Sequence, residues 1–245
     1  MFIRFLCIFR YFMRLTIANV SATIKTHGVQ FLQKEGISMT RLLCLGDSIT
    51  DCGRLFSRDP LGNGYVKLLS RMLHDNGHIF SVENRGIDGF TIERLLHNAD
   101  SWVETSDPDM ITILIGINDI GIMMNTRRTS EQQHSLMNEF STRYELLAKK
   151  LSNITAGRKL FFLEPFVFPW PRCYVSWIPL LAQMSRQILK ISRKYGAVFV
   201  PLQNELNQEA ERLGMAAITV DGIHLTPQGH EFLAKKLYAL ITSER

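Results

Sequence analysis

Five short and almost continuous apolar runs recur between residue 40 and the end of the chain. They are Arg41–Leu45, Ile79–Val82, Met110–Ile115, Leu160–Leu163 and Ala197–Val200. A strand that is covered on both faces needs apolar side chains at nearly every position, whereas a half-exposed strand alternates apolar with polar residues. The runs therefore predict strands that are covered on both faces, in a parallel sheet.

Helical patterns fill the intervals between these runs. The predicted helices are Tyr65–His74, Glu131–Leu151, Pro179–Tyr195, Gln203–Leu213 and Pro227–Ile241. Thr226 is a suitable N-cap for the last of them. Strands that alternate with helices are joined by right-handed crossovers, so the sequence predicts an α/β fold, a three-layer α/β/α sandwich around a five-stranded parallel sheet.

Composition and charge narrow the class of protein. The chain has 245 residues, enough for one domain with a well-buried core, and is 46% hydrophobic and 21% charged. Residues 1–38 hold five Lys or Arg and one acid, whereas the other 207 residues hold 23 basic and 22 acidic side chains. That balance argues against a nucleic-acid partner. The four cysteines form no CxxC pair and no metal-ligand spacing, so we expect reduced thiols and no metal.

Residues 1–38 do not fit an ordinary targeting segment. Three arginines interrupt the apolar stretch, which leaves neither a transmembrane span nor a signal-peptide core, so we expect no membrane insertion. The codons for residues 34–36 can spell a purine-rich ribosome-binding sequence two codons before Met39. We therefore expect an atypical leader over residues 1–38, a translation start at Met39, and a single domain over residues 39–245 in the bacterial cytoplasm.

Small and polar residues follow the predicted strands at their carboxyl ends, where open α/β sheets carry their functional loops. Gly46–Gly53, Asn84–Thr91 and Gly116–Gly121 follow the first three strands, and a further loop follows Leu163. Asp221–His224 precedes the last helix and can fold over the same edge. We therefore expect these segments to form one site.

Three residues in these loops have the chemistry of serine hydrolysis. Ser48 is the candidate nucleophile, His224 the base that takes its proton, and Asp221 the group that orients the imidazole. A separation of three residues places Asp221 and His224 on one short loop. The alternatives are that Ser48 caps a helix and that Asp221 and His224 form a surface ion pair.

Acyl transfer also needs hydrogen-bond donors for the developing oxyanion. Gly86 has no Cβ to shield its N–H, Asn118 offers a side-chain amide, and Ser48 offers its own N–H. A tight turn at Gly86 and an Asx turn at Asn118 are the structural alternatives. We expect Asp47 and Asp119 to brace loops by accepting backbone hydrogen bonds.

Four blocks taken together resemble the SGNH, or GDSL, hydrolase family. They are Gly46-Asp47-Ser48-Ile49, Gly86, Gly116-Ile117-Asn118-Asp119 and Asp221-Gly222-Ile223-His224, in the family's order and spacing over about residues 40–242. The resemblance implies a flavodoxin-like sheet and a serine esterase that works through an acyl-enzyme, without a cofactor. It also implies a triad of Ser48, Asp221 and His224, and an oxyanion hole of Ser48, Gly86 and Asn118.

A narrower resemblance concerns the substrate. Asp51-Cys52-Gly53-Arg54, Leu61–Val66 and Tyr195–Leu206 are similar to segments of SGNH acetylesterases that act on xylan and xylo-oligosaccharides. This implies a small ester substrate, an O-acetyl group on a carbohydrate. Where those enzymes usually carry a Trp-Arg pair, this chain has Ile120-Gly121-Ile122. The alternatives are a lysophospholipase-like or thioesterase-like lipid acyl hydrolase and a non-catalytic carbohydrate-binding protein.

The segment 161–177 is rich in aromatic residues and prolines. Phe161 and Phe162 belong to the fourth predicted strand, so we expect them in the core. The other aromatic residues follow that strand, and prolines stiffen the segment. Aromatic faces suit a sugar ring, an acyl chain or a second subunit of a homo-oligomer, and simple packing is the alternative.

Overall fold

A computed structural model describes residues 39–124, 128–154 and 159–243. The predicted leader over residues 1–38 lies outside the described residues. Five parallel strands form one sheet in the order β2-β1-β3-β4-β5. The strands are β1 (Thr40–Gly46), β2 (Phe80–Gly86), β3 (Met110–Leu114), β4 (Lys159–Leu163) and β5 (Val198–Val200). The predicted α/β class and five-stranded parallel sheet are confirmed.

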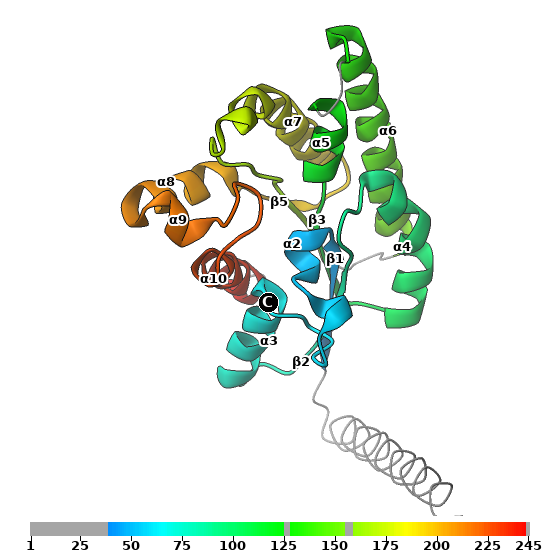
Figure 1. Cartoon of the computed structure of the whole chain (residues 1–245). Coiled ribbons are helices and arrows are strands. Elements are labelled where there is room, and N and C mark those ends of the chain that lie inside the picture. Colours follow the sequence, from blue (N-terminus) through cyan, green and yellow to red (C-terminus); the bar gives the residue numbers. More distant parts are fainter. Residues whose placement is uncertain (1–38, 125–127, 155–158, 244–245) are drawn as a thin grey trace, which may run out of the picture. The chain divides into compact units, whose positions relative to one another are not determined.

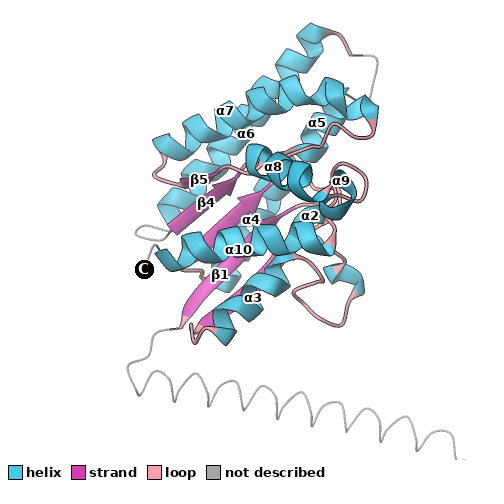
Figure 2. Ribbon diagram, turned by 90° about the vertical axis from the view of Figure 1, so that its left-hand side faces the viewer, coloured by secondary structure: helices cyan, strands magenta, loops and turns pink. Residues whose placement is uncertain are grey.

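Helices cover both faces of this sheet, as Figures 1 and 2 show. α3 and α10 pack together on one face, while α4, α6 and α7 form a continuous layer on the other. The helices are α2 (Ser48–Asp51), α3 (Tyr65–Asp75), α4 (Ile92–Ser106), α5 (Ile117–Met124), α6 (Ser130–Ile154), α7 (Ile178–Lys194), α8 (Gln203–Leu213), α9 (Met215–Ile218) and α10 (Pro227–Ser243), with short 3-10 turns at Arg54–Phe56 and Arg172–Trp177. Among the described residues, none of these helices combines the length and apolar character needed to cross a bilayer.

The core lies between the sheet and the helix layers. Phe161 and Phe162 on β4 are fully buried, as expected. The ring of Phe162 meets Tyr144 of α6 edge to face, with centroids 5.3 Å apart. Such pairs stabilise a core beyond the area they bury, so this contact helps to dock α6 on β4.

The structure differs from the sequence prediction at the edge strand β2. The apolar run ends at Val82, but the strand continues to Gly86 and includes Glu83 and Arg85, whose side chains form an ion pair at 2.5 Å. An edge strand has one neighbour and a half-exposed face, so it tolerates polar residues that a central strand excludes. The predicted loop Asn84–Thr91 therefore begins inside β2.

Two further segments that the prediction assigns to loops or leaves unassigned are helical. α4 buries Ile92, Leu95, Ala99 and Val103 on one face, a spacing typical of an amphipathic helix. In the predicted loop Gly116–Gly121, the helix α5 begins one residue after the glycine. The motif that contains Asn118 therefore lies on the first turn of a helix.

The strand register determines where the functional loops meet. Gly46 at the end of β1 lies opposite Gly86 on β2 and Leu114 on β3. The three strands therefore end at one level of the sheet. The segments that follow them, which carry Ser48 and Asn118, emerge side by side at this carboxyl edge.

Candidate active site

Ser48 begins the one-turn helix α2 directly after β1. Asp47 is the N-cap, and its Oδ1 accepts a hydrogen bond from the Ile49 N–H at 3.1 Å. A Cβ at Gly46 would lie 2.2 Å from Thr50 Oγ1 and 2.6 Å from Leu114 O, so only glycine permits this tight strand-to-helix turn. The turn leaves the Ser48 side chain half-buried and accessible at the sheet edge.

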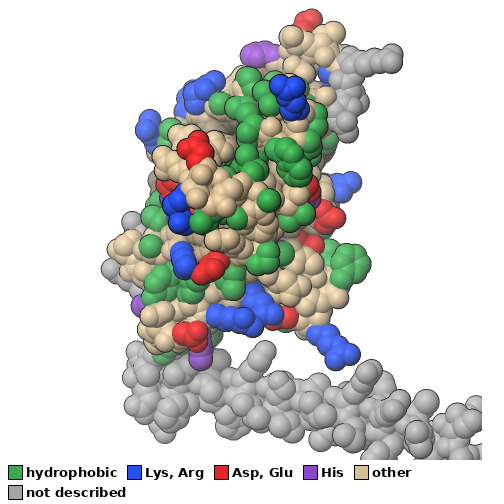
Figure 3. Space-filling model, turned by 60° about the vertical axis from the view of Figure 1, so that its left-hand side comes forward, with side chains coloured by type: hydrophobic (Ala, Val, Ile, Leu, Met, Phe, Trp, Pro, Cys, Tyr) green, Lys and Arg blue, Asp and Glu red, His purple; other side chains and the backbone are tan. Residues whose placement is uncertain are grey.

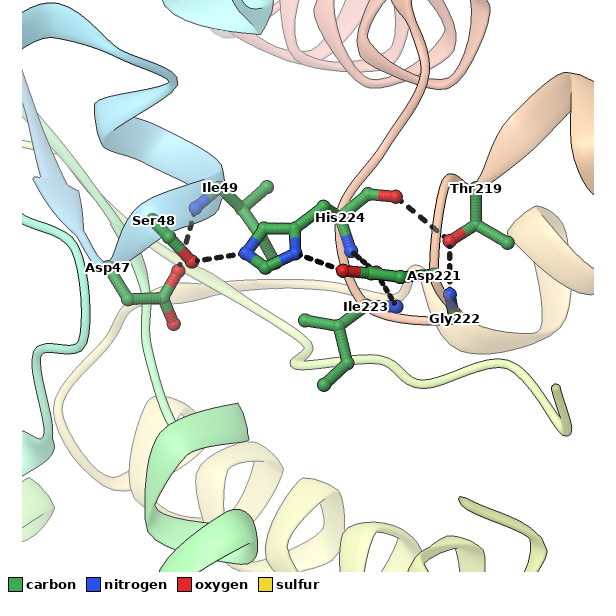
Figure 4. Close-up of polar contacts among 8 residues, drawn as sticks. All are labelled: Asp47, Ser48, Ile49, Thr219, Asp221, Gly222, Ile223 and His224. Atoms are coloured by element: carbon green, nitrogen blue, oxygen red, sulfur yellow. Dashed lines mark hydrogen bonds and ion pairs between the residues drawn. The ribbon is translucent and has the colours of Figure 1, made fainter. Parts of the chain in front are cut away.

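Ser48, Asp221 and His224 (the predicted triad) are brought together, as Figure 4 shows. Ser48 Oγ lies 3.0 Å from His224 Nε2, and His224 Nδ1 lies 2.6 Å from Asp221 Oδ2. A carboxylate at Nδ1 fixes the tautomer that carries its hydrogen there, which leaves the Nε2 lone pair directed at the serine hydroxyl. The arrangement can therefore remove a proton from Ser48.

The loop that carries Asp221 and His224 is held by its own hydrogen bonds. Asp221 Oδ1 accepts from the N–H groups of Ile223 at 2.9 Å and His224 at 2.8 Å. Thr219 Oγ1 accepts from the Gly222 N–H and donates to the His224 carbonyl, both at 2.8 Å. Gly222 adopts φ +94°, a value that favours glycine. The side chains of Asp221 and His224 therefore start from a fixed backbone.

The electrostatics of Asp221 favour its charged form. Partial burial opposes ionisation, but hydrogen bonds from the His224 side chain and from the His224 and Ile223 N–H groups outweigh it and lower the pKa of Asp221. The carboxylate is therefore suited to stabilise a positively charged imidazole beside it.

The predicted oxyanion donors have different environments. Asn118 is half-buried, and its Nδ2 donates to the Phe90 carbonyl at 2.9 Å, which orients the amide and leaves a second N–H hydrogen. The Gly86 N–H, in contrast, donates to Asn84 Oδ1 at 2.8 Å. A Cβ at Gly86 would lie 2.2 Å from the Asp51 nitrogen. In this structure Gly86 allows β2 to approach α2 closely, and its N–H is already bonded to Asn84.

Two buried carboxyl groups brace the loops, as expected. Asp119 accepts from the Ile92 N–H with Oδ2 at 3.2 Å, in the same way that Asp47 accepts from Ile49. Burial raises the pKa of each carboxyl to about 7, and the charge of Asp47 adds to the effect at Asp119. Both groups can accept a hydrogen bond through a carbonyl oxygen when they are protonated.

The aromatic residues of the segment 161–177 divide into two groups. Phe166 and Phe168 are fully buried and pack against each other. Trp170 is 52% exposed, and its carbonyl lies 1.8 Å from where a Cβ of Gly222 would be. Tyr174 also borders Gly222, and Trp177, which Tyr174 contacts with ring centroids 4.6 Å apart, borders Gly121 of α5. These two rings therefore extend from the triad loop to the Asn118 helix.

The structure adds a contact that the sequence analysis does not predict. Cys52 Sγ lies 3.3 Å from His230 Nε2, and His230 Nδ1 accepts from the Tyr65 N–H at 3.2 Å. Burial lowers the pKa of His230 to about 4, so this imidazole is neutral near pH 7. Cys52 and His230 are 178 residues apart, and no spacing in the sequence links the two, so the sequence does not identify the pair.

Replacement of Asp119 by Asn should make stability less dependent on pH. The folded carboxyl keeps its proton up to about pH 7, whereas the unfolded one loses it near 3.8, so the folded state binds more protons between these values. Stability then falls as pH rises through this window, by about 1.4 kcal/mol per pH unit from a single such group. Urea unfolding at pH 5, 6 and 7 should show a smaller decrease in Asp119→Asn than in the wild type. The exposed Asp75→Asn should keep the wild-type slope, and equal slopes in all three proteins would contradict this account.

Comparisons with known proteins agree with this geometry. The model of the GDSL-like Lipase/Acylhydrolase family matches residues 44–232. An acetylxylan esterase of Geobacillus stearothermophilus is 29% identical over 210 residues, which cover 80% of this chain and 90% of that enzyme. An isoamyl acetate-hydrolyzing esterase 1 homolog of Bos taurus is 23% identical over 224 residues, which cover 82% of this chain and 81% of the bovine protein.

Solved structures show the same likeness. The Geobacillus acetylxylan esterase superposes with a TM-score of 0.70 and 26% identity, covering 83% of this chain and 94% of its own. Its solved catalytic mutants replace a serine, an aspartate and a histidine by alanine. An α/β hydrolase from the metagenome of Lake Arreo shares the fold, with a TM-score of 0.72, 22% identity and coverage of 82% of this chain and 94% of its own. The chain therefore belongs to the GDSL-like lipase/acylhydrolase family and is a carboxylic ester hydrolase.

Proposed function

We propose that Ser48, His224 and Asp221 hydrolyse short-chain acyl esters through an acyl-enzyme. The observation that carries this proposal is the continuous contact from Ser48 Oγ to His224 Nε2 at 3.0 Å and from His224 Nδ1 to Asp221 Oδ2 at 2.6 Å. A hydroxyl, an imidazole and a carboxylate in this order are the groups that acyl transfer at a serine nucleophile needs.

The proposed reaction proceeds in two halves. Ser48 Oγ attacks the ester carbonyl while His224 Nε2 takes the hydroxyl proton, and the ionised Asp221 stabilises the imidazolium. The imidazolium then donates that proton to the leaving alcohol, and an acyl-serine ester remains. Water repeats the sequence with His224 as base, which releases the carboxylic acid and restores the serine hydroxyl.

Three donors are proposed for the oxyanion. The Ser48 N–H and the free hydrogen of the Asn118 amide are two of them. We assign the third to the N–H of Gly89, because the Gly86 N–H would first have to leave Asn84. Gly89 adopts φ +70° with no atom within 4 Å of a would-be Cβ, and its neighbour Phe90 accepts the Asn118 hydrogen bond. Gly89 and the Asn118 amide are therefore close together.

We propose an O-acetyl group on a carbohydrate as the substrate. The names of both relatives refer to an acetyl ester. The alcohol of that ester is a xylan in one name and isoamyl alcohol in the other. The rings of Tyr174 and Trp177 and the exposed Trp170 offer flat apolar faces beside the triad loop, which suit a sugar ring. Trp177 packs against Gly121. Gly121 lies in the segment where the similar acetylesterases usually carry a tryptophan and this chain does not.

Exposed apolar residues and free thiols support two minor proposals. Trp170, Val175 and Val220 are at least half exposed. Figure 3 shows hydrophobic side chains gathered on the upper part of one face of the molecule. We propose that a second copy of the chain can pack on exposed apolar surface of this kind. The three described cysteines are free thiols, which supports a reducing compartment such as the cytoplasm.

Ser48→Ala should abolish hydrolysis of p-nitrophenyl acetate, with a loss on the order of 10⁴-fold or more, because Ser48 is the hydroxyl that lies against the His224 base. A fluorophosphonate should label the wild type once, at Ser48, as peptide mass spectrometry can verify. Ser152→Ala, a change on α6, serves as the control and should retain full activity and labelling. Labelling at another residue, or activity in Ser48→Ala, would refute the assignment.

The acyl group and the alcohol can be tested separately. Among p-nitrophenyl esters, kcat/KM should be highest for acetate and fall steeply from butyrate to octanoate. Acetate release from acetylated xylo-oligosaccharides should then exceed release from isoamyl acetate. A preference for octanoate would favour the lipid acyl hydrolase instead, and a preference for isoamyl acetate would remove the sugar from the proposal.

Two glycines with nearly the same φ allow the effect of local backbone strain to be distinguished from an effect on the triad. Gly222 and Gly214 adopt φ +94° and +92°, but a Cβ would clash with the Trp170 carbonyl only at Gly222. Gly222→Ala should lower kcat for p-nitrophenyl acetate by about 100-fold, because it displaces Asp221 and His224. Gly214→Ala should keep kcat and lose only stability, on the order of 1–3 kcal/mol in urea unfolding. Equal kcat values in the two variants would disprove the link.

A further inference from the structure

Residues 164–171, which we call the strap, run from the end of β4 to the triad loop. The Phe168 N–H donates to the Gly222 carbonyl at 2.8 Å. The Trp170 carbonyl oxygen occupies the space that a Cβ of Gly222 would need. Gly222 stands between Asp221 and the two N–H groups that the Asp221 carboxylate accepts. A displacement of the strap would therefore move Gly222, and with it the neighbouring residue Asp221.

The other side of the strap borders a cavity. Val167 and Pro169, which flank Phe168, line an open cavity of about 400 Å³ between α7 and α8. Its wall also includes Leu181 of α7 and Phe199 of β5. Val167 is fully buried all the same, and Phe168 packs against Phe166, so apolar contacts hold the strap on its inner side. On the side of the cavity, directional bonds add to this packing.

Gln203, the first residue of α8, supplies these bonds. Its Oε1 accepts from the Val167 N–H at 2.9 Å, and its Nε2 donates to the Val167 carbonyl at 3.0 Å. A primary amide is the side chain that can satisfy both backbone groups of one residue at once. Nε2 also donates to Asn207 Oδ1 at 3.0 Å, one turn further along α8.

Gln203 is in turn fixed to the sheet. Glu164 Oε2, just beyond β4, accepts from the N–H groups of Leu202 at 2.8 Å and Gln203 at 3.0 Å. This bond caps the start of α8, where N–H groups lack helical partners. The strap is thus tied at one end to α8 by Glu164 and in its middle by Gln203.

We propose that Gln203 is a positioning residue for the reaction: by clamping Val167 it holds the strap against Gly222 and so keeps Asp221 and His224 aligned with Ser48. This inference rests on the proposed triad and extends it to a residue outside the site. Gln203 contacts neither the triad nor the edge where the substrate would bind. Its loss should therefore lower the chemical rate and leave substrate affinity nearly unchanged.

The first test compares two neighbouring residues that line the same cavity. Gln203→Met keeps the side-chain length but removes both bonds to Val167, and it should lower kcat for p-nitrophenyl acetate and the rate of fluorophosphonate labelling by about 10- to 100-fold. KM should change less than twofold. Asn204→Ala, which has no bond to the strap, should keep wild-type values. A wild-type kcat in folded Gln203→Met would overturn the proposal.

A second variant distinguishes clamping from general stability. In Gln203→Glu, the introduced carboxyl group accepts from the Val167 N–H in either form, but it donates to the Val167 carbonyl only while it is protonated. The ratio of variant to wild-type labelling rate should therefore be highest near pH 5 and fall towards pH 8. Glu164 and Arg186 are the charged residues of the cavity, and they are the same in both proteins.

The outcomes separate this inference from the proposed function. A ratio that does not change with pH, with Ser48 labelled in the wild type, overturns the role of Gln203 alone. Absence of Ser48 labelling in the wild type overturns the proposed triad, and the role of Gln203 with it. If Gln203→Met does not fold, the pH-dependent ratio in Gln203→Glu still decides between the two roles of Gln203.

Discussion

The site depends on a close backbone approach at the carboxyl edge of the sheet. A Cβ at Gly46 would meet Thr50, and a Cβ at Gly86 would meet the Asp51 nitrogen, each at 2.2 Å. These two glycines lie opposite each other on β1 and β2, so α2 is seated directly on the ends of the paired strands. The position of Ser48 at the start of α2 is therefore set by the close approach of α2 to the ends of these two strands.

Charge is distributed unevenly around this turn. Asp47 and Asp119 are buried on the protein side of the nucleophile, where burial raises the pKa of each to about 7. Asp221 lies on the solvent side, where its hydrogen bonds lower the pKa. Negative charge is thus concentrated next to the imidazole that would become positive, and reduced where an oxyanion would form.

The parts of the fold and site that sequence can predict are those with a local signature. The central strands are apolar throughout, and Asp221 and His224 are three residues apart, so both can be recognised from spacing. The full length of β2 cannot be predicted from an apolar run, because an edge strand tolerates polar residues such as Glu83 and Arg85. The Asn84 bond that takes the Gly86 N–H is local, but it depends on a rotamer. The hydrogen bonds between Gln203 and Val167 join residues that are 36 positions apart in the sequence, and no pattern in either segment predicts them.

One feature of α2 has a consequence for folding. Cys52 ends this helix with φ +40°, a left-handed conformation that glycine would adopt without strain, and yet it carries a side chain. That side chain contacts His230 on α10, the last helix described, and Ser48 likewise contacts His224 just before α10. Contacts between residues this distant in sequence form only after long loops have closed. The nucleophile turn therefore has all its native contacts only when the two ends of the domain are together, so the site needs the last helix as much as it needs the first strand.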